Sequence, residues 1–90
     1  MTYKEMLEVR GECNAKLLLI MSMLVEKHPE LRFGQILYNF GFITKPLKEG
    51  EAPKLFDPFN EEPVVTFKRV CKEVERYGAR YKNILKLVND

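Results

Sequence analysis

The sequence predicts a small all-α domain of three or four helices, with a long proline-rich loop between the second and third. Apolar residues recur at helical spacing through most of the chain. No alternating apolar–polar run exceeds four residues, so a sheet is not expected. Ninety residues suffice for one domain at most. We therefore expect 1–90 to form a single helical domain, with helices at about 3–27, 30–41, 61–77 and 79–89.

The first helix is predicted over 3–27. Thr2 and Glu5 have the spacing of a capping box, in which two side chains satisfy free backbone groups at a helix start. Pro29 disfavours helical geometry at the residue before it, so the helix should end there. Residues 17–25 are apolar on almost every side. Such a helix must be covered on more than one side, by the other helices or by a second copy of the chain.

The second helix is predicted over 30–41. Proline is tolerated in a first helical turn and an acidic residue is favourable there, so the helix should start at Pro29 or Glu30. Gly41 stands where a left-handed residue commonly ends a helix. Four residues at helical spacing are expected to face the core: Phe33, Ile36, Leu37 and Phe40.

A long loop is predicted over 44–60, because this charged stretch has no helical or strand period. It is interrupted by Pro46, Gly50, Pro53 and Pro58. Connections of this length in a compact domain are usually functional or mobile, and the sequence leaves the role of this one open.

The third helix is predicted from Asn60, a good N-cap residue, with Pro63 in its first turn. Its apolar face contains Phe67, Val70, Cys71 and Val74. Gly78 predicts a kink or a break between 61–77 and 79–89. The same apolar period then resumes at Tyr81, Ile84, Leu85 and Val88.

The sequence offers no group of residues suited to catalysis. It has one histidine, His28, at a helix end, and one serine within an apolar helix. Neither Cys13 nor Cys71 has neighbouring ligands at metal-binding spacing. A glycine-rich phosphate loop is also absent. We therefore expect no enzyme, no cofactor and no metal.

The same composition predicts a cytoplasmic protein. The longest apolar stretch, 17–25, falls well short of the roughly 20 residues that span a bilayer, so no membrane association is expected. The N-terminal residues lack the basic-then-apolar order of a signal sequence. Two distant cysteines in apolar helical patterns are typical of free thiols in a reducing compartment.

The basic residues gather toward the C-terminus. Residues 1–63 carry 8 basic and 10 acidic side chains, a balance of −2, whereas 64–90 carry 7 and 3, a balance of +4. If one helix continued through Gly78, a single stripe would include Arg69, Lys72, Arg76 and Arg80. Such a stripe would bind nucleic acid through its phosphates, largely without sequence specificity. A solvated basic helix face is the alternative.

Two segments carry a resemblance: His-Pro-Glu-Leu-Arg-Phe-Gly-Gln at 28–35 and Asp-Pro-Phe at 57–59. Together they resemble a pattern in short uncharacterised helical proteins encoded by phages and prophages. The resemblance covers about half of the chain and implies a small accessory protein of a mobile element in a bacterial host cell. It implies no particular activity, and it favours a role in binding a partner.

Arg32 is predicted to point away from the core and to reach an acidic cluster between the two segments. This structural clamp would join Arg32 to Asp57, Glu61 and Glu62. The sequence thus predicts a non-catalytic accessory protein that acts by protein–protein binding and forms a homo-oligomer. The alternative is a nucleic-acid-associated protein that uses its basic C-terminal helix.

Overall fold

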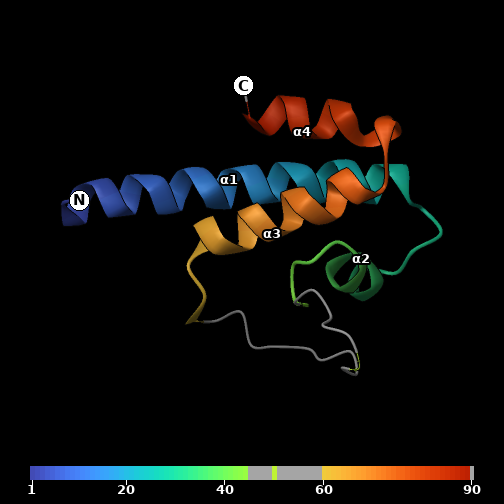
Figure 1. Cartoon of the computed structure of the whole chain (residues 1–90), viewed down its shortest axis with the longest axis horizontal. Coiled ribbons are helices and arrows are strands. Elements are labelled where there is room, and N and C mark those ends of the chain that lie inside the picture. Colours follow the sequence, from blue (N-terminus) through green and yellow to red (C-terminus); the bar gives the residue numbers. More distant parts are fainter. Residues whose placement is uncertain (45–49, 51–59, 90) are drawn as a thin grey trace.

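The computed structural model describes residues 1–44, 50 and 60–89. These residues form four α-helices and no strand, so the all-α prediction is confirmed (Figure 1). The helices are α1 (Tyr3–Lys27), α2 (Phe33–Asn39), α3 (Pro63–Arg76) and α4 (Lys82–Asn89), with a 3-10 turn η2 (Ala79–Tyr81) before α4. Most of the predicted 44–60 loop lies outside the described residues.

Helix α1 is the longest element and has the predicted limits. The Thr2 hydroxyl oxygen accepts a hydrogen bond from the Glu5 backbone N–H at 3.1 Å, as an N-cap should. At the other end, the His28 N–H donates to the Leu24 carbonyl at 2.9 Å. The backbone of His28 is no longer helical, with φ −125° and ψ 66°. This agrees with the restriction that Pro29 imposes on the residue before it.

The other helices pack along α1, which forms the spine of the structure. Figure 1 shows α3 and α4 beside its central and C-terminal parts, and α2 near its C-terminal end. The first turns of α1 extend beyond α3 and α4 (Figure 1). The most deeply buried aliphatic residues come from all four helices: Ile20, Leu24, Ile36, Val70, Val74, Ile84 and Val88.

Helix α2 starts three residues later than predicted. Residues 28–31 form a turn in which the Leu31 N–H donates to the His28 carbonyl at 3.1 Å. The helix then begins after Arg32, whose backbone N–H donates to the Gln35 side chain at 2.8 Å. The prediction that Phe33 faces the core is wrong, because this residue opens the helix and is 57% exposed. Ile36 and Phe40 are buried as predicted, and Leu37 packs against the core.

Gly41 ends α2 in the predicted manner. Its φ of +83° is left-handed, and the Phe42 N–H donates to the Leu37 carbonyl at 3.0 Å, which is the long hydrogen bond of a Schellman motif. A Cβ at this position would lie 2.9 Å from Cγ of Glu73. Both backbone conformation and close packing therefore require glycine here.

Helices α3 and α4 are separate elements. Helix α3 begins at Pro63 with Glu62 as its N-cap, so the prediction of Asn60 as the cap is wrong. Gly78 breaks the helical path with φ +98°, which confirms the break. The predicted apolar faces hold: Val70, Val74, Tyr81, Ile84 and Val88 are buried, and Phe67, Cys71 and Leu85 pack against the core.

Candidate functional site

Arg69 is a buried structural residue of α3. Its Nε atom donates to the Gly41 carbonyl at 2.7 Å. Two further nitrogens, Nη1 and Nη2, donate to the Glu61 carboxylate at 2.9 and 2.7 Å. The Thr66 hydroxyl also donates to this carboxylate. This bidentate pairing with the carboxylate fixes the orientation of the guanidinium. Arg69 thus ties α3 both to the end of α2 and to the chain just before α3.

The predicted nucleic-acid stripe does not form as one surface. Arg69 is only 8% exposed and is occupied by Glu61. Lys72 and Arg76 lie on the exposed side of α3, where Arg76 Nη1 is 3.2 Å from the Glu73 carboxylate. Arg80 follows the break at Gly78 and lines a different hollow. The predicted stripe is therefore broken within α3 by the burial of Arg69, and it is broken again at Gly78.

The acidic residues of the predicted clamp bind other arginines. Glu61 pairs with Arg69, and Glu62 pairs with Arg10 of α1, with 2.8 Å between Nη2 and Oε1. Arg32 is exposed at the start of α2, and no ion pair joins it to either glutamate. Asp57 lies outside the described residues. The prediction that Arg32 clamps these two glutamates is therefore wrong, because Arg10 and Arg69 bind them instead.

His28 forms the centre of a polar connection that the sequence did not reveal. Its Nδ1 lies 2.9 Å from the Glu30 carboxylate, and its Nε2 lies 2.6 Å from the Tyr81 hydroxyl oxygen. The carboxylate can only accept, so Nδ1–H donates to it, and in the neutral imidazole Nε2 accepts from Tyr81. The hydrogen bond from His28 lowers the pKa of Glu30. This connection joins the end of α1 to the start of α4.

Aromatic rings surround this connection. The His28 and Tyr81 rings are stacked with centroids 5.8 Å apart, and Phe40 lies 4.5 Å from the Tyr77 ring. A carboxylate, an imidazole and a hydroxyl in sequence are also the parts of an activated nucleophile. Here, however, Tyr81 is 2% exposed, so a substrate cannot reach its oxygen without rearrangement. The arrangement is suited to holding helices together.

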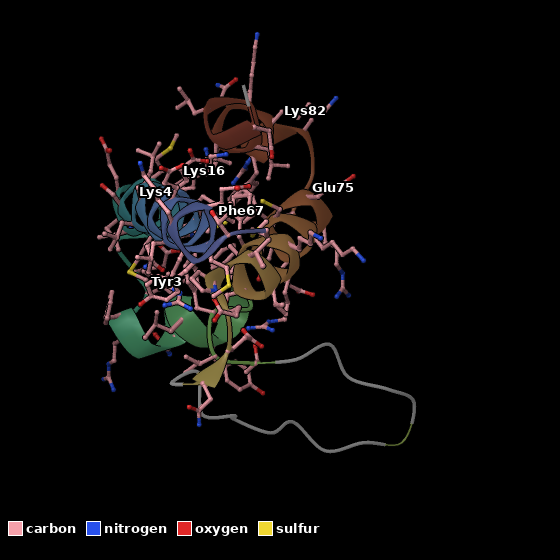
Figure 2. The ribbon with its side chains drawn as sticks, turned by 90° about the vertical axis from the view of Figure 1, so that its left-hand side faces the viewer. Tyr3, Lys4, Lys16, Phe67, Glu75 and Lys82 are labelled. Atoms are coloured by element: carbon pink, nitrogen blue, oxygen red, sulfur yellow. The ribbon has the colours of Figure 1, made fainter. Side chains whose placement is uncertain are left out.

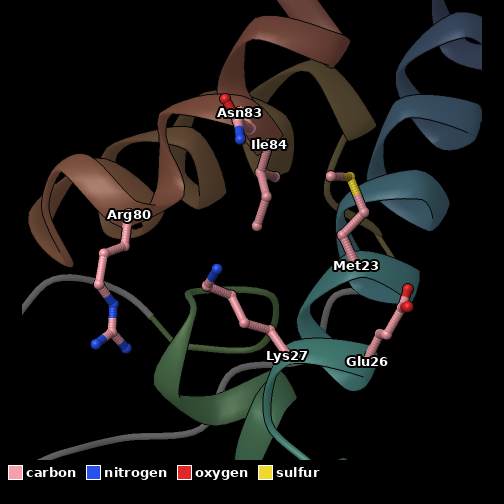
Figure 3. Close-up of a pocket in the computed structure, with 6 residues that line it drawn as sticks. All are labelled: Met23, Glu26, Lys27, Arg80, Asn83 and Ile84. Atoms are coloured by element: carbon pink, nitrogen blue, oxygen red, sulfur yellow. The ribbon is translucent and has the colours of Figure 1, made fainter.

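A hollow of about 270 Å³ lies between the C-terminal part of α1 and the η2–α4 corner. Its lining residues are Met23, Glu26, Lys27, Arg80, Asn83 and Ile84. The Lys27 ammonium also lies 5.1 Å from the centroid of the Tyr81 ring. Figure 3 shows the Glu26 carboxylate turned away from Lys27, while Arg80 points outward on the opposite side. The charged lining residues are all exposed, so the hollow is a shallow, mixed-charge surface.

One face of α1 carries exposed apolar side chains. Leu7, Leu18 and Val25 are 44%, 67% and 44% exposed. These three residues and three others between them lie alternately four and three positions apart, which is the spacing of a coiled-coil seam. We call this set the α1 seam: Leu7, Gly11, Asn14, Leu18, Met21 and Val25. Gly11 opens onto free space, with nothing within 4 Å of a Cβ placed there.

The described helices leave five residues of the α1 seam exposed, whereas the sixth, Met21, is half-buried and packs against the core. Figure 2 looks along α1 from its N-terminal end, with α4 above, α3 to the right and α2 below. No described helix occupies the remaining side. The buried residues Cys13, Ile20 and Leu24 point toward the other helices and away from the exposed residues of the seam. The apolar run at 17–25 is thus covered on part of its circumference only.

Within the described ranges, no three His, Cys, Asp or Glu side chains are grouped so as to hold a metal ion. Cys13 and Cys71 are free thiols, and burial raises the pKa of Cys71. None of the described helices combines the length and the apolar character needed to cross a bilayer.

Comparison with protein-family models, with curated proteins and with solved structures gave no match for this chain. We therefore infer its function from the chemistry of its own surfaces.

Proposed function

We propose that this chain is a non-catalytic accessory protein that acts by protein–protein binding and self-association through the α1 seam. The observation that carries the proposal is the exposure of Leu7, Leu18 and Val25 along one uncovered helix face. A surface helix normally presents polar residues on its solvent side. Burial of apolar surface stabilises a complex by about 25 cal/mol per Å² before the costs of association. A partner on this face would therefore be favoured.

The shape of the molecule supports the same role. The first turns of α1 extend beyond α3 and α4 (Figure 1), and exposed apolar residues occur on several sides of them, including Tyr3, Met6 and Leu7. An isolated helical segment gains little stability from its own backbone hydrogen bonds. Contact with another molecule would stabilise these turns. The resemblance of residues 28–35 and 57–59 to short phage proteins favours an accessory role in a bacterial cytoplasm.

The proposal is tested by sedimentation velocity over a wide range of protein concentration. We expect the parent chain to associate as concentration rises, and Leu18→Glu to remain monomeric. Leu87→Glu is the matched control, because Leu87 is 59% exposed on α4 and lies outside the α1 seam. A parent chain that stays monomeric throughout, or equal effects of the two substitutions, would contradict the proposal.

Nucleic-acid binding is the second candidate, and one observation favours it. Lys68, Lys72 and Arg76 are all exposed on α3 and line one hollow of its surface. Three cations can supply only a modest, salt-dependent affinity for phosphates. Fluorescence anisotropy with labelled duplex and single-stranded DNA at low salt tests this candidate. Binding that is lost in Lys72→Glu/Arg76→Glu and kept in Leu18→Glu would favour it over the α1 seam.

A further inference from the structure

We infer that the partner on the α1 seam is a second copy of this chain, bound with the two α1 helices antiparallel. In this arrangement Leu7 of each copy packs against Val25 of the other. The inference rests on the proposed self-association and adds the direction and the register of the two α1 helices.

The spacing of the α1 seam is self-complementary in one antiparallel register. When Leu7 lies opposite Val25 of the second copy, Gly11 lies opposite Met21, and Asn14 lies opposite Leu18. Each of these layers pairs an a position with a d position, the layer type of antiparallel helix pairs. All six residues of the seam are used, and every layer occurs twice because the interface is two-fold symmetric.

The sizes of the paired side chains also fit. Gly11 leaves open space on its face of α1, and in this register it faces Met21 of the second copy. The Met21 side chain is half-buried against its own core, and its exposed part would contact that space. Methionine readily fills irregular gaps of this kind. In a parallel pair the two Gly11 residues would face each other and leave the gap empty. A void of this kind loses contacts on both sides.

Charges at the ends of the seam favour the same direction. Lys4 lies one heptad before Gly11 and extends the seam at its N-terminal end, while Glu26 borders Val25 at the other end. Both side chains are exposed. An antiparallel pair brings Lys4 of one copy near Glu26 of the other, at both ends of the interface. A parallel pair would instead place like charges near each other.

The protruding turns of α1 are covered in this arrangement. They pass beside the C-terminal half of α1 in the second copy, so Leu7 gains a neighbour that its own chain does not supply. A contact made mainly by one helix from each copy is small compared with a standard protein interface. We therefore expect a dimer that dissociates on dilution.

Disulfide cross-linking tests the direction directly. Leu7→Cys and Val25→Cys are prepared as single variants and oxidised separately and as an equimolar mixture. In the antiparallel dimer, positions 7 and 25 of the two copies are close enough for a disulfide. Two copies of position 7, by contrast, are separated by about 27 Å, from 18 residues at 1.5 Å each. We expect at least tenfold more linked dimer in the mixture than in either single variant.

The parent chain, which keeps Cys13 and Cys71, serves as the control for unrelated cross-links, and circular dichroism confirms that each variant is folded. If Leu7→Cys by itself formed as much linked dimer as the mixture, the two α1 helices would be parallel. That result would overturn this inference and leave the proposed function standing. A parent chain that dimerises by sedimentation without a 7–25 link would overturn the register and leave self-association intact. A parent chain that never dimerises would overturn the proposed function as well.

Discussion

The His28 imidazole and the Tyr81 hydroxyl meet at 2.6 Å, although 53 residues separate them in the sequence. His28 follows the last turn of α1 and Tyr81 ends the 3-10 turn before α4. The short contact therefore fixes the end of the longest helix against the beginning of the last one. Both rings are largely enclosed, and a buried polar pair of this kind must stay hydrogen-bonded to avoid the cost of desolvation.

Tyr81→Phe keeps the ring and removes only the hydroxyl. We expect it to lower the free energy of unfolding by about 1 kcal/mol, since His28 loses its hydrogen-bond partner at Nε2. Urea denaturation followed by circular dichroism measures the change. Tyr77→Phe is the matched control, because Tyr77 is partly exposed and belongs to the same aromatic group. A similar loss in both variants would show that the hydrogen bond has no special role.

The lowered pKa of Glu30 predicts a dependence of stability on acid pH. A carboxyl group whose pKa is lower in the folded state than in the unfolded state stabilises the fold at pH above its ordinary pKa, and this contribution is lost as pH falls through the folded-state value. The main cause is the hydrogen bond from His28. Glu30→Gln should therefore show a smaller loss of stability between neutral and acid pH than the parent chain. Thermal melts at a series of pH values measure this; identical slopes in the two proteins would contradict the assignment.

Arg69→Met replaces a buried guanidinium by an apolar side chain of similar length. The Glu61 carboxylate and the Gly41 carbonyl would lose their donor in a nearly enclosed place. Loss of one partner of such a pair costs about 3 kcal/mol or more, a large share of the stability of a 90-residue domain. Chemical denaturation measures the loss. Lys68→Met, the adjacent exposed position, should change stability by no more than about 0.5 kcal/mol.

Alanine at Gly41 and at Gly11 should have opposite effects. At Gly41 the left-handed backbone and the approach of Glu73 at 2.9 Å predict a loss of about 1–2 kcal/mol. At Gly11 a methyl group meets nothing within 4 Å of its position, so helix propensity predicts a gain of up to about 1 kcal/mol. Thermal denaturation at low protein concentration measures both changes without a contribution from association. Equal effects at the two positions would contradict this account of the Gly41 turn.

Local chemistry predicted most of the fold. Thr2, Pro29, Gly41 and Gly78 act through their own backbone and their nearest neighbours, and the structure places a helix end at or beside each of them. The start of α2 was predicted too early, because the turn at 28–31 depends on a hydrogen bond rather than on the proline alone. The helical spacing of Phe33 predicts a core position. Spacing along one helix does not show whether another helix covers the residue, and Phe33 is exposed.

The surface residues were harder to predict because their partners are distant in sequence. The basic stripe required an exposed Arg69. In the structure Arg69 is buried because it donates hydrogen bonds to the Gly41 carbonyl, 28 residues away, and to the Glu61 carboxylate. The His28–Tyr81 contact has no local pattern at all. The α1 seam was only partly foreseen: the apolar excess at 17–25 was evident, but its uncovered side depends on where α2, α3 and α4 pack.

Arg69 has one more consequence, for the evolution of chain length. The guanidinium holds Gly41 and Glu61 together, so the two ends of the intervening sequence are fixed in place by α3 itself. Closing a longer loop between fixed ends costs only about 0.6 kcal/mol for each doubling of its length. Insertions and deletions between these anchor points should therefore be inherited at little cost to the helices.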